Sequence, residues 1–178
     1  MNKILVIDPG KGWGHFVSKM YCYKKISEHF NSKIIFLTKK TTQAKDYLNN
    51  LDFCEEVIYL DEPKKGVYNF INHLKSFFEN LKKINATNCN KCFIFHPSLR
   101  FLLMAKISKI KNLWCLGYKF QNFFLSKERK IYNNFFSEAI PNDEETLEFV
   151  KKITNEKKII FKPLESLNKN EQDTVGII

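Results

Sequence analysis

Short apolar runs alternate with amphipathic segments along the first 155 residues of this 178-residue chain. The runs are rich in branched apolar side chains, which is typical of strands buried on both faces. They cover Lys3–Ile7, Lys33–Thr38, Glu56–Leu60, Cys92–His96 and Leu113–Gly117. Between and after them, apolar residues at helical spacing predict helices. These cover Phe16–Phe30, Thr41–Leu51, Val67–Ile84, Leu99–Ile110 and Asn142–Ile153, with Thr41 or Thr42, Ser98 and Asn142 as expected N-caps.

Strands that alternate with helices predict an α/β fold, a Rossmann-like doubly wound parallel sheet with helices on both faces. For five strands the expected order is 3-2-1-4-5, in which strands one and four are neighbours and the winding reverses between them. Ligands of such sheets bind at that reversal, outside the carboxyl ends of the strands. Residues 118–140 show no clear pattern, and residues 174–178 resemble the start of another strand.

A glycine-rich turn, Asp8–His15, follows the first strand directly and holds three of the six glycines of the chain. A helix is expected to begin behind it, so backbone N–H groups and a helix N-terminus meet where an anion or a sugar would bind. The glycine spacing matches neither a dinucleotide fingerprint nor a P-loop. An oxidoreductase that places Lys39 or Lys40 on the extra phosphate of a phosphorylated dinucleotide stays open as an alternative.

The expected topology brings this turn beside the exit of the fourth strand, and the candidate site residues come from both. The candidates for substrate binding are Gly10, Lys11, Gly12, Gly14, His96, Ser98 and Arg100. His15 would be mainly neutral in the first turn of a helix, so it is a candidate general base. Asp8 is the rival base. Each has a structural alternative: His15 as a residue that begins the helix, Asp8 as an isolated carboxylate that fixes the turn, His96 as a filler at the strand end.

The composition of the chain argues against several classes of protein. An apolar content of 44% excludes general disorder. The net charge of +10 comes almost wholly from lysine and fits either an AT-rich genome or attraction to phosphate-bearing or membrane-surface partners. The lysine doublets are scattered, so no nucleic-acid partner is expected. Cys89 and Cys92 form a lone pair without a second one, so no metal is expected. No apolar stretch is long enough to span a bilayer, and a cytoplasmic location is expected.

The ordered motifs resemble the N-terminal half of glycosyltransferase family nine, the heptosyltransferases that build the inner core of lipopolysaccharide. Ile4–His15 is similar to the family's opening strand and Pro-Gly-x-x-Gly-Asp turn, except that His15 stands in place of the aspartate. Phe53–Asp61 is similar to its third strand, Pro97–Arg100 to its Gly-Ser-Leu-Arg exit, and Leu113–Tyr118 to its Arg-Ile-Gly-Tyr strand. The resemblance covers about the first 155 residues.

The resemblance implies a GT-B enzyme whose N-terminal domain receives the acceptor and whose C-terminal domain holds a nucleotide sugar such as ADP-heptose, with no cofactor or metal. The acceptor would be lipopolysaccharide, another surface glycan or a lipid-linked glycan. The enzyme would act in the cytoplasm, peripherally at the cytoplasmic face of the inner membrane. The family's aspartate is the proposed base, and it maps onto His15.

The resemblance also divides the chain into an acceptor-side domain, residues 1–155, and residues 156–178 as a linker and the first strand of a C-terminal domain that is missing. We therefore expect that this chain alone does not transfer sugar. A non-catalytic sugar- or anion-binding module is the second hypothesis, and the oxidoreductase is the third.

Overall fold

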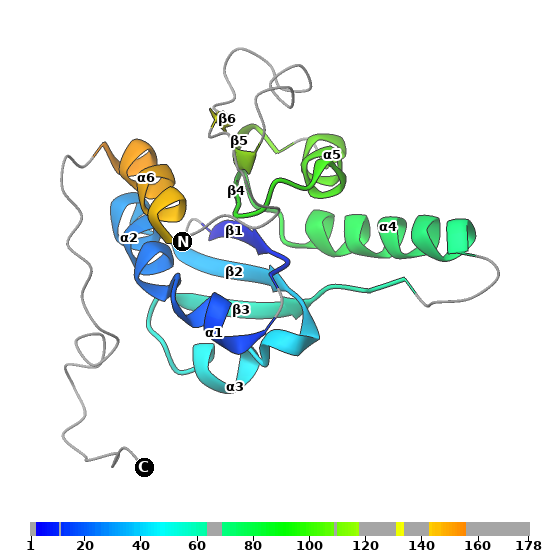
Figure 1. Cartoon of the computed structure of the whole chain (residues 1–178), viewed down its shortest axis with the longest axis horizontal. Helices are drawn as coiled ribbons and strands as arrows, with labels where there is room; N and C mark the ends of the chain where they lie inside the picture. Colours follow the sequence, from blue (N-terminus) through cyan, green and yellow to red (C-terminus); the bar gives the residue numbers. More distant parts are fainter. Residues whose placement is uncertain are drawn as a thin grey trace.

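A computed structural model describes residues 3–10, 12–63, 69–108, 110–117, 131–133 and 143–155. Its centre is a six-stranded sheet in the order β3-β2-β1-β4-β5-β6, in which every neighbouring pair is parallel (Figure 1). The strands are β1 (Lys3–Asp8), β2 (Lys33–Thr38), β3 (Cys54–Tyr59), β4 (Lys91–Ile94), β5 (Asn112–Gly117) and β6 (Ile131–Asn133). The predicted order of the first five strands is confirmed. β6 adds an edge strand within the stretch where the sequence shows no pattern.

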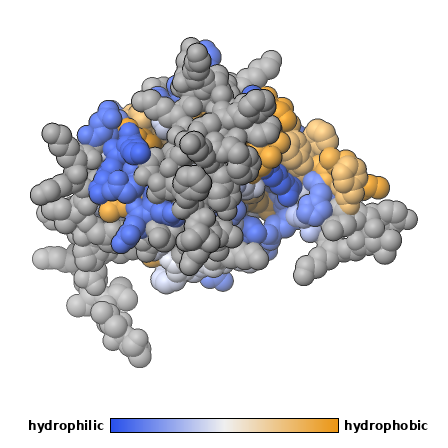
Figure 2. All heavy atoms as spheres, turned by 45° about the horizontal axis from the view of Figure 1, so that its top comes forward, coloured by the Kyte–Doolittle hydropathy of each residue, from blue (hydrophilic) through white to orange (hydrophobic). Residues whose placement is uncertain are grey.

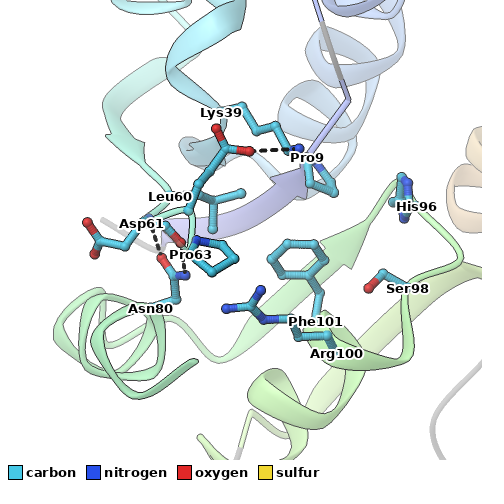
Figure 3. A pocket seen from close by; sticks show the side chains of 11 residues that line it. Pro9, Lys39, Leu60, Asp61, Pro63, Asn80, His96, Ser98, Arg100 and Phe101 are labelled. Carbon is cyan, nitrogen blue, oxygen red and sulfur yellow. Dashed lines mark hydrogen bonds and ion pairs between the residues drawn. The ribbon is translucent and has the colours of Figure 1, made fainter. Parts of the chain in front are cut away.

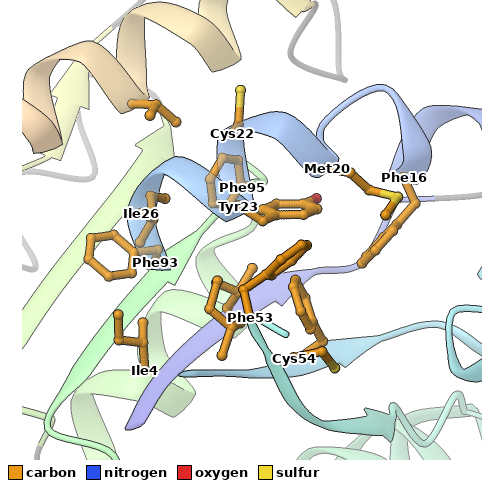
Figure 4. Packing of buried hydrophobic residues seen from close by; sticks show 14 of the residues in the cluster. Ile4, Phe16, Met20, Cys22, Tyr23, Ile26, Phe53, Cys54, Phe93 and Phe95 are labelled. Atoms are coloured by element: carbon orange, nitrogen blue, oxygen red, sulfur yellow. The ribbon is translucent and has the colours of Figure 1, made fainter. Parts of the chain in front are cut away.

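The apolar strands are buried on both faces because alternate residues enter two different cores. One core includes Val6 of β1 and Phe36 of β2 and is completed by α1, α2, α3 and α6 (Figure 4). The other includes Leu5 of β1 and Leu37 of β2 and is completed by α4 and α5. The helices are α1 (Trp13–Val17), α2 (Met20–Phe30), α3 (Lys45–Leu48), α4 (Asn69–Ala86), α5 (Leu99–Ile107) and α6 (Asp143–Thr154).

The helix predicted over residues 16–30 forms as two separate helices, α1 and α2, so only its continuity is wrong. A turn at Ser18 and Lys19 divides them, and the Lys19 N–H bonds the Phe16 carbonyl, three residues back, at 3.2 Å. This turn lets the Lys19 side chain point into the protein, where its Nζ lies 2.9 Å from the Asp8 carboxylate. The helix is therefore interrupted at the point where Lys19 forms its ion pair with Asp8.

The predicted helix over residues 41–51 is confirmed in part, since α3 covers four of its residues. A 3₁₀ turn, η1 (Lys40–Thr42), precedes α3, and Gln43 between them has a left-handed backbone with φ 52°. The Thr42 hydroxyl donates to the Lys39 carbonyl at 2.6 Å instead of capping a helix. α5 ends at Ile107, three residues earlier than predicted. Lys11, Asn142 and residues 156–178 lie outside the described residues, as does the side chain of His15.

Candidate functional site

A cavity of about 450 Å³ opens at the carboxyl edge of the sheet (Figure 3). Residues that directly follow β1, β2, β3 and β4 line it together with side chains of α4 and α5. They are Pro9, Lys39, Leu60, Asp61, Glu62, Pro63, Asn80, His96, Ser98, Arg100 and Phe101. The cavity thus lies where a doubly wound sheet is expected to bind ligands, beside the reversal between β1 and β4.

The structure divides the predicted site residues into two groups. His96, Ser98 and Arg100, from the exit of β4, all line the cavity. Among the described residues of the glycine-rich turn, Pro9 lines it, while Gly10, Gly12 and Gly14 do not. His15 lies in the first turn of α1, as predicted for its backbone, but α1 has only five residues. So short a helix supplies little of the dipole on which the predicted anion site at this turn depended.

The segment from His96 to Arg100 brings polar groups to the cavity because Pro97 follows β4 and α5 begins directly afterwards. Ser98 occupies the N-cap position of α5, with an extended backbone at φ −79° and ψ 116°. The prediction that Ser98 caps α5 is wrong in its chemistry, since its side chain makes no capping hydrogen bond. Its hydroxyl is half-buried at the wall of the cavity.

Arg100 brings a positive charge to the cavity, and its hydrogen-bond partner is uncharged. Its Nη2 donates to the hydroxyl of Ser76 at 2.8 Å. Partial burial lowers the pKa of Arg100 from its ordinary value, and a guanidinium remains charged at neutral pH. Of the residues that the structure describes, none with a carboxylate forms an ion pair with Arg100. Its charge is therefore available to an anionic ligand in the cavity.

The two carboxylates at the rim are both paired with lysine. Glu62 lies 2.9 Å from the Nζ of Lys39, and Asp61 lies 2.6 Å from the Nζ of Lys83. Each of these ion pairs leaves less net negative charge at the rim of the cavity. The arrangement favours binding of an anion over binding of a cation.

α4 fixes the wall of the cavity that follows β3. The buried amide of Asn80 accepts a hydrogen bond from the Asp61 N–H at 2.8 Å and donates one to the Asp61 carbonyl at 2.9 Å. The Ser76 hydroxyl donates to the same carbonyl. Because Ser76 also accepts from Arg100, the cation and this wall share one hydrogen-bond network.

Asp8 is not the isolated carboxylate that the sequence suggested. It is fully buried, with the Lys19 Nζ and the Tyr23 hydroxyl on one oxygen at 2.9 and 2.5 Å. Its other oxygen accepts from the Gly10 N–H at 3.0 Å. Burial alone would raise the pKa of Asp8, but the charge of Lys19 and these hydrogen bonds outweigh it and hold that pKa below its ordinary value. These contacts favour the structural alternative, in which Asp8 fixes the glycine-rich turn.

The sequence reasoning did not identify Lys39, Asp61, Glu62 and Asn80 as part of one site. Lys39 follows β2 directly, and Asp61 and Glu62 lie just beyond β3. The rule that carboxyl ends of parallel strands share one edge of the sheet indicates these positions. Asn80 had no signal, because its amphipathic helix places it inward together with apolar residues.

No protein-family model matches the sequence, and no curated protein matches it by sequence. Solved structures do match the fold. A glycosyl transferase family 9 structure from Veillonella parvula gives a TM-score of 0.63 at 15% identity, over 85% of this chain and 41% of that one. MurG from Acinetobacter baumannii gives 0.54 at 15% identity, over 80% and 43%. The Escherichia coli ADP-heptose LPS heptosyltransferase II gives 0.49 at 12% identity, over 64% and 30%, which is too weak to carry an argument.

These likenesses confirm the predicted fold class, a Rossmann-like parallel sheet of the kind found in GT-B domains. At 15% identity they show the fold and not the activity. The chain spans less than half the length of either of the two better-matching structures. Among the helices that the structure describes, none has both the length and the apolar character needed to cross a membrane.

Proposed function

We propose that this chain is the acceptor-side half of a glycosyltransferase, and that the cavity at the carboxyl edge of the sheet receives a glycan with an anionic group. The observation that carries the proposal is Arg100, a cation with a neutral partner, in a cavity that also offers Ser98 and His96. Hydroxyl and imidazole groups bind sugar hydroxyls, and a guanidinium binds phosphate or carboxylate. The fold shared with the family 9 structure supports the same class of protein.

The finer part of the proposal is a heptosyltransferase-like reaction. A second domain outside this chain would hold the nucleotide sugar, such as ADP-heptose, and the acceptor would be lipopolysaccharide or another surface glycan. A base is then needed to take the proton of the acceptor hydroxyl. Asp8 is engaged by Lys19, Tyr23 and Gly10, which supports His15 for this role.

The second candidate, a non-catalytic anion- or sugar-binding module, is favoured by one observation. Both carboxylates at the rim are paired with lysines, so the described cavity is equipped for binding more clearly than for proton transfer. The oxidoreductase has no comparable support, because Lys39, one of its two proposed phosphate ligands, is paired with Glu62.

Titration calorimetry with a phosphorylated lipopolysaccharide core oligosaccharide and its dephosphorylated form tests the binding. We expect the phosphorylated form to bind more tightly. Arg100→Gln should weaken that binding by about tenfold or more, since a hydrogen bond to a charged group contributes about 1.5–3 kcal/mol. Lys106→Gln, an exposed lysine on the same helix, should leave it unchanged. Equal binding by Arg100→Gln and the unchanged protein would contradict the proposal.

An assay of sugar transfer distinguishes the glycosyltransferase from the non-catalytic binding module. The 178-residue chain should give no turnover with ADP-heptose or other nucleotide sugars. In a two-domain protein that carries this chain as its first half, transfer should occur, and His15→Ala should abolish it. Unchanged transfer by His15→Ala would remove His15 from the chemistry, and absence of transfer by the two-domain protein would favour the binding module.

A further inference from the structure

One side of α4 leaves large apolar side chains in solvent. The exposed fractions are 73% for Phe70, 59% for Ile71, 42% for Leu74 and 55% for Phe78. At 100° per residue these four residues fall on one stripe of the helix, about a quarter of its circumference. Figure 2 shows orange atoms gathered toward the end of the molecule where α4 extends in Figure 1. Exposed apolar surface of this extent on a single element marks an interaction surface.

Basic side chains border this stripe. Lys75 and Lys82 are exposed, and at helical spacing both lie directly beside the apolar stripe. The opposite side of α4 faces the protein through Ser76, Asn80 and Ile84, all of which are buried. An apolar stripe with lysines along one border, on a helix that does not cross a membrane, is the pattern of a helix that lies in the interface of a bilayer. We call Phe70, Ile71, Leu74, Lys75, Phe78 and Lys82 the α4 face.

The charge of the helices differs between the two faces of the sheet. α4 and α5 together carry five basic side chains and one acidic side chain, Glu79. On the other face, α2 and α6 carry four basic and five acidic side chains. The layer with the exposed apolar stripe is therefore also the layer with the positive charge, and Ile107 at the end of α5 adds another apolar residue, 53% exposed.

The positive charge of the α4 and α5 layer distinguishes between two possible partners of the α4 face, a second copy of this chain and a lipid bilayer. A symmetric dimer through α4 would bring two positively charged layers together, which costs electrostatic energy. An anionic bilayer is complementary to both features, because its headgroups attract the lysines and its acyl boundary receives the apolar residues. We propose that the α4 face docks this protein on the surface of an anionic phospholipid bilayer. This inference does not depend on the proposed glycosyl transfer.

Flotation of the protein with vesicles tests the docking. The vesicles consist of phosphatidylcholine with or without phosphatidylglycerol. We expect binding to the vesicles that contain phosphatidylglycerol, weaker binding to pure phosphatidylcholine, and a loss of binding as salt is raised. The double variant Phe70→Ser and Phe78→Ser should bind at least about tenfold more weakly, since it removes two large apolar side chains from the contact.

Two variants on the other face of the sheet serve as controls, and a lysine variant of α4 tests the charge. Trp13→Ser removes an apolar side chain of α1 that is 54% exposed, and it should leave vesicle binding unchanged. Lys75→Gln with Lys82→Gln should weaken binding by about thirtyfold, given about 1 kcal/mol for each lysine near an anionic surface. Lys152→Gln, an exposed lysine of α6, should have no effect. Circular dichroism of each variant checks that it is folded.

Three results would overturn the docking proposal. The protein fails to float with vesicles that contain phosphatidylglycerol, or the double phenylalanine variant binds them as well as the unchanged protein does. Alternatively, light scattering shows a dimer that the double phenylalanine variant converts to a monomer while vesicle binding is unchanged, so that a second copy covers the α4 face.

Discussion

The two loops that leave the sheet at its reversal have opposite environments. After β1, Asp8 is fully buried and all its described contacts are internal, to Lys19, Tyr23 and Gly10. After β4, Ser98 and Arg100 are only partly buried and line the cavity. β1 and β4 are adjacent and parallel, so the two loops begin side by side.

This contrast teaches that the position of a charged residue at a strand end does not by itself decide its role. The charge of Asp8 is neutralised because α2 and the turn before it deliver Lys19 and Tyr23 to the same point. Within the described part of the chain, the hydrogen-bond partner of the Arg100 guanidinium is a neutral hydroxyl, that of Ser76. What the neighbouring helix brings to the loop separates a structural residue from a candidate binding residue.

The largest effect should come from breaking the buried ion pair. Lys19→Met leaves the Asp8 carboxylate buried without its cation, and removal of one partner of a buried pair costs about 3–5 kcal/mol. We expect a loss of that size in the free energy of unfolding measured by urea denaturation. Lys82→Met, which removes an exposed lysine paired with Glu79, should give no measurable change. The double variant Asp8→Asn and Lys19→Met should be more stable than Lys19→Met alone, and the reverse order would contradict the ion-pair explanation.

The same ion pair predicts an acid-dependent stability. The pKa of Asp8 in the folded protein is below the ordinary value of 3.8, so in acid the unfolded chain binds this proton more readily than the folded protein does. The contribution is complete above the ordinary pKa and is lost as pH falls through the lower folded pKa. The difference in unfolding free energy between the unchanged protein and Asp8→Asn should therefore be constant near neutral pH and shrink below about pH 4. A difference that grows on acidification would refute this.

A smaller effect is expected at the backbone of the same loop. Gly12 has φ 86° and ψ 157°, a conformation that side-chain-bearing residues adopt at a cost of about 1–3 kcal/mol. Gly12→Ala should lower the unfolding free energy by that amount. Gly14→Ala is the matched control, because Gly14 lies within α1 and an added Cβ meets no atom within 4 Å. It should leave stability unchanged or raise it by up to about 1 kcal/mol. Equal losses in both variants would show that the positive φ of Gly12 is not the cause of its loss.

The sequence predicted the order of the first five strands because each strand is a continuous apolar run buried on both faces. It also predicted that the exit of β4 lies at the site, since strand order alone places His96, Ser98 and Arg100 at the reversal. β6 has only three residues and gave no signal in the pattern. Long-range partners were not predictable either, because nothing in the helical period of residues 16–30 shows that Lys19 turns inward toward Asp8.

The smallest effect should appear at Ser98, and it tests the open side of the comparison. Replacing an N-cap serine by alanine usually lowers the free energy of unfolding by about 0.5–2 kcal/mol, because the serine hydroxyl accepts a hydrogen bond from a helix N–H. Ser98 makes no such bond, so Ser98→Ala should change the unfolding free energy by no more than about 0.5 kcal/mol. Ser76→Ala, the matched serine, removes the acceptor of Arg100 and a donor to Asp61, and should cost about 1–2 kcal/mol.

If the Ser98 hydroxyl serves a ligand instead of the helix, Ser98→Ala should still weaken binding of the core oligosaccharide by roughly threefold to tenfold, as expected for one neutral hydrogen bond. Urea denaturation and calorimetry on the same preparations measure both quantities. A stability loss as large as that of Ser76→Ala, with unchanged binding, would make Ser98 a structural residue. The β4 exit would then resemble the β1 exit, and Arg100 would be the principal polar contact left at this loop for the ligand.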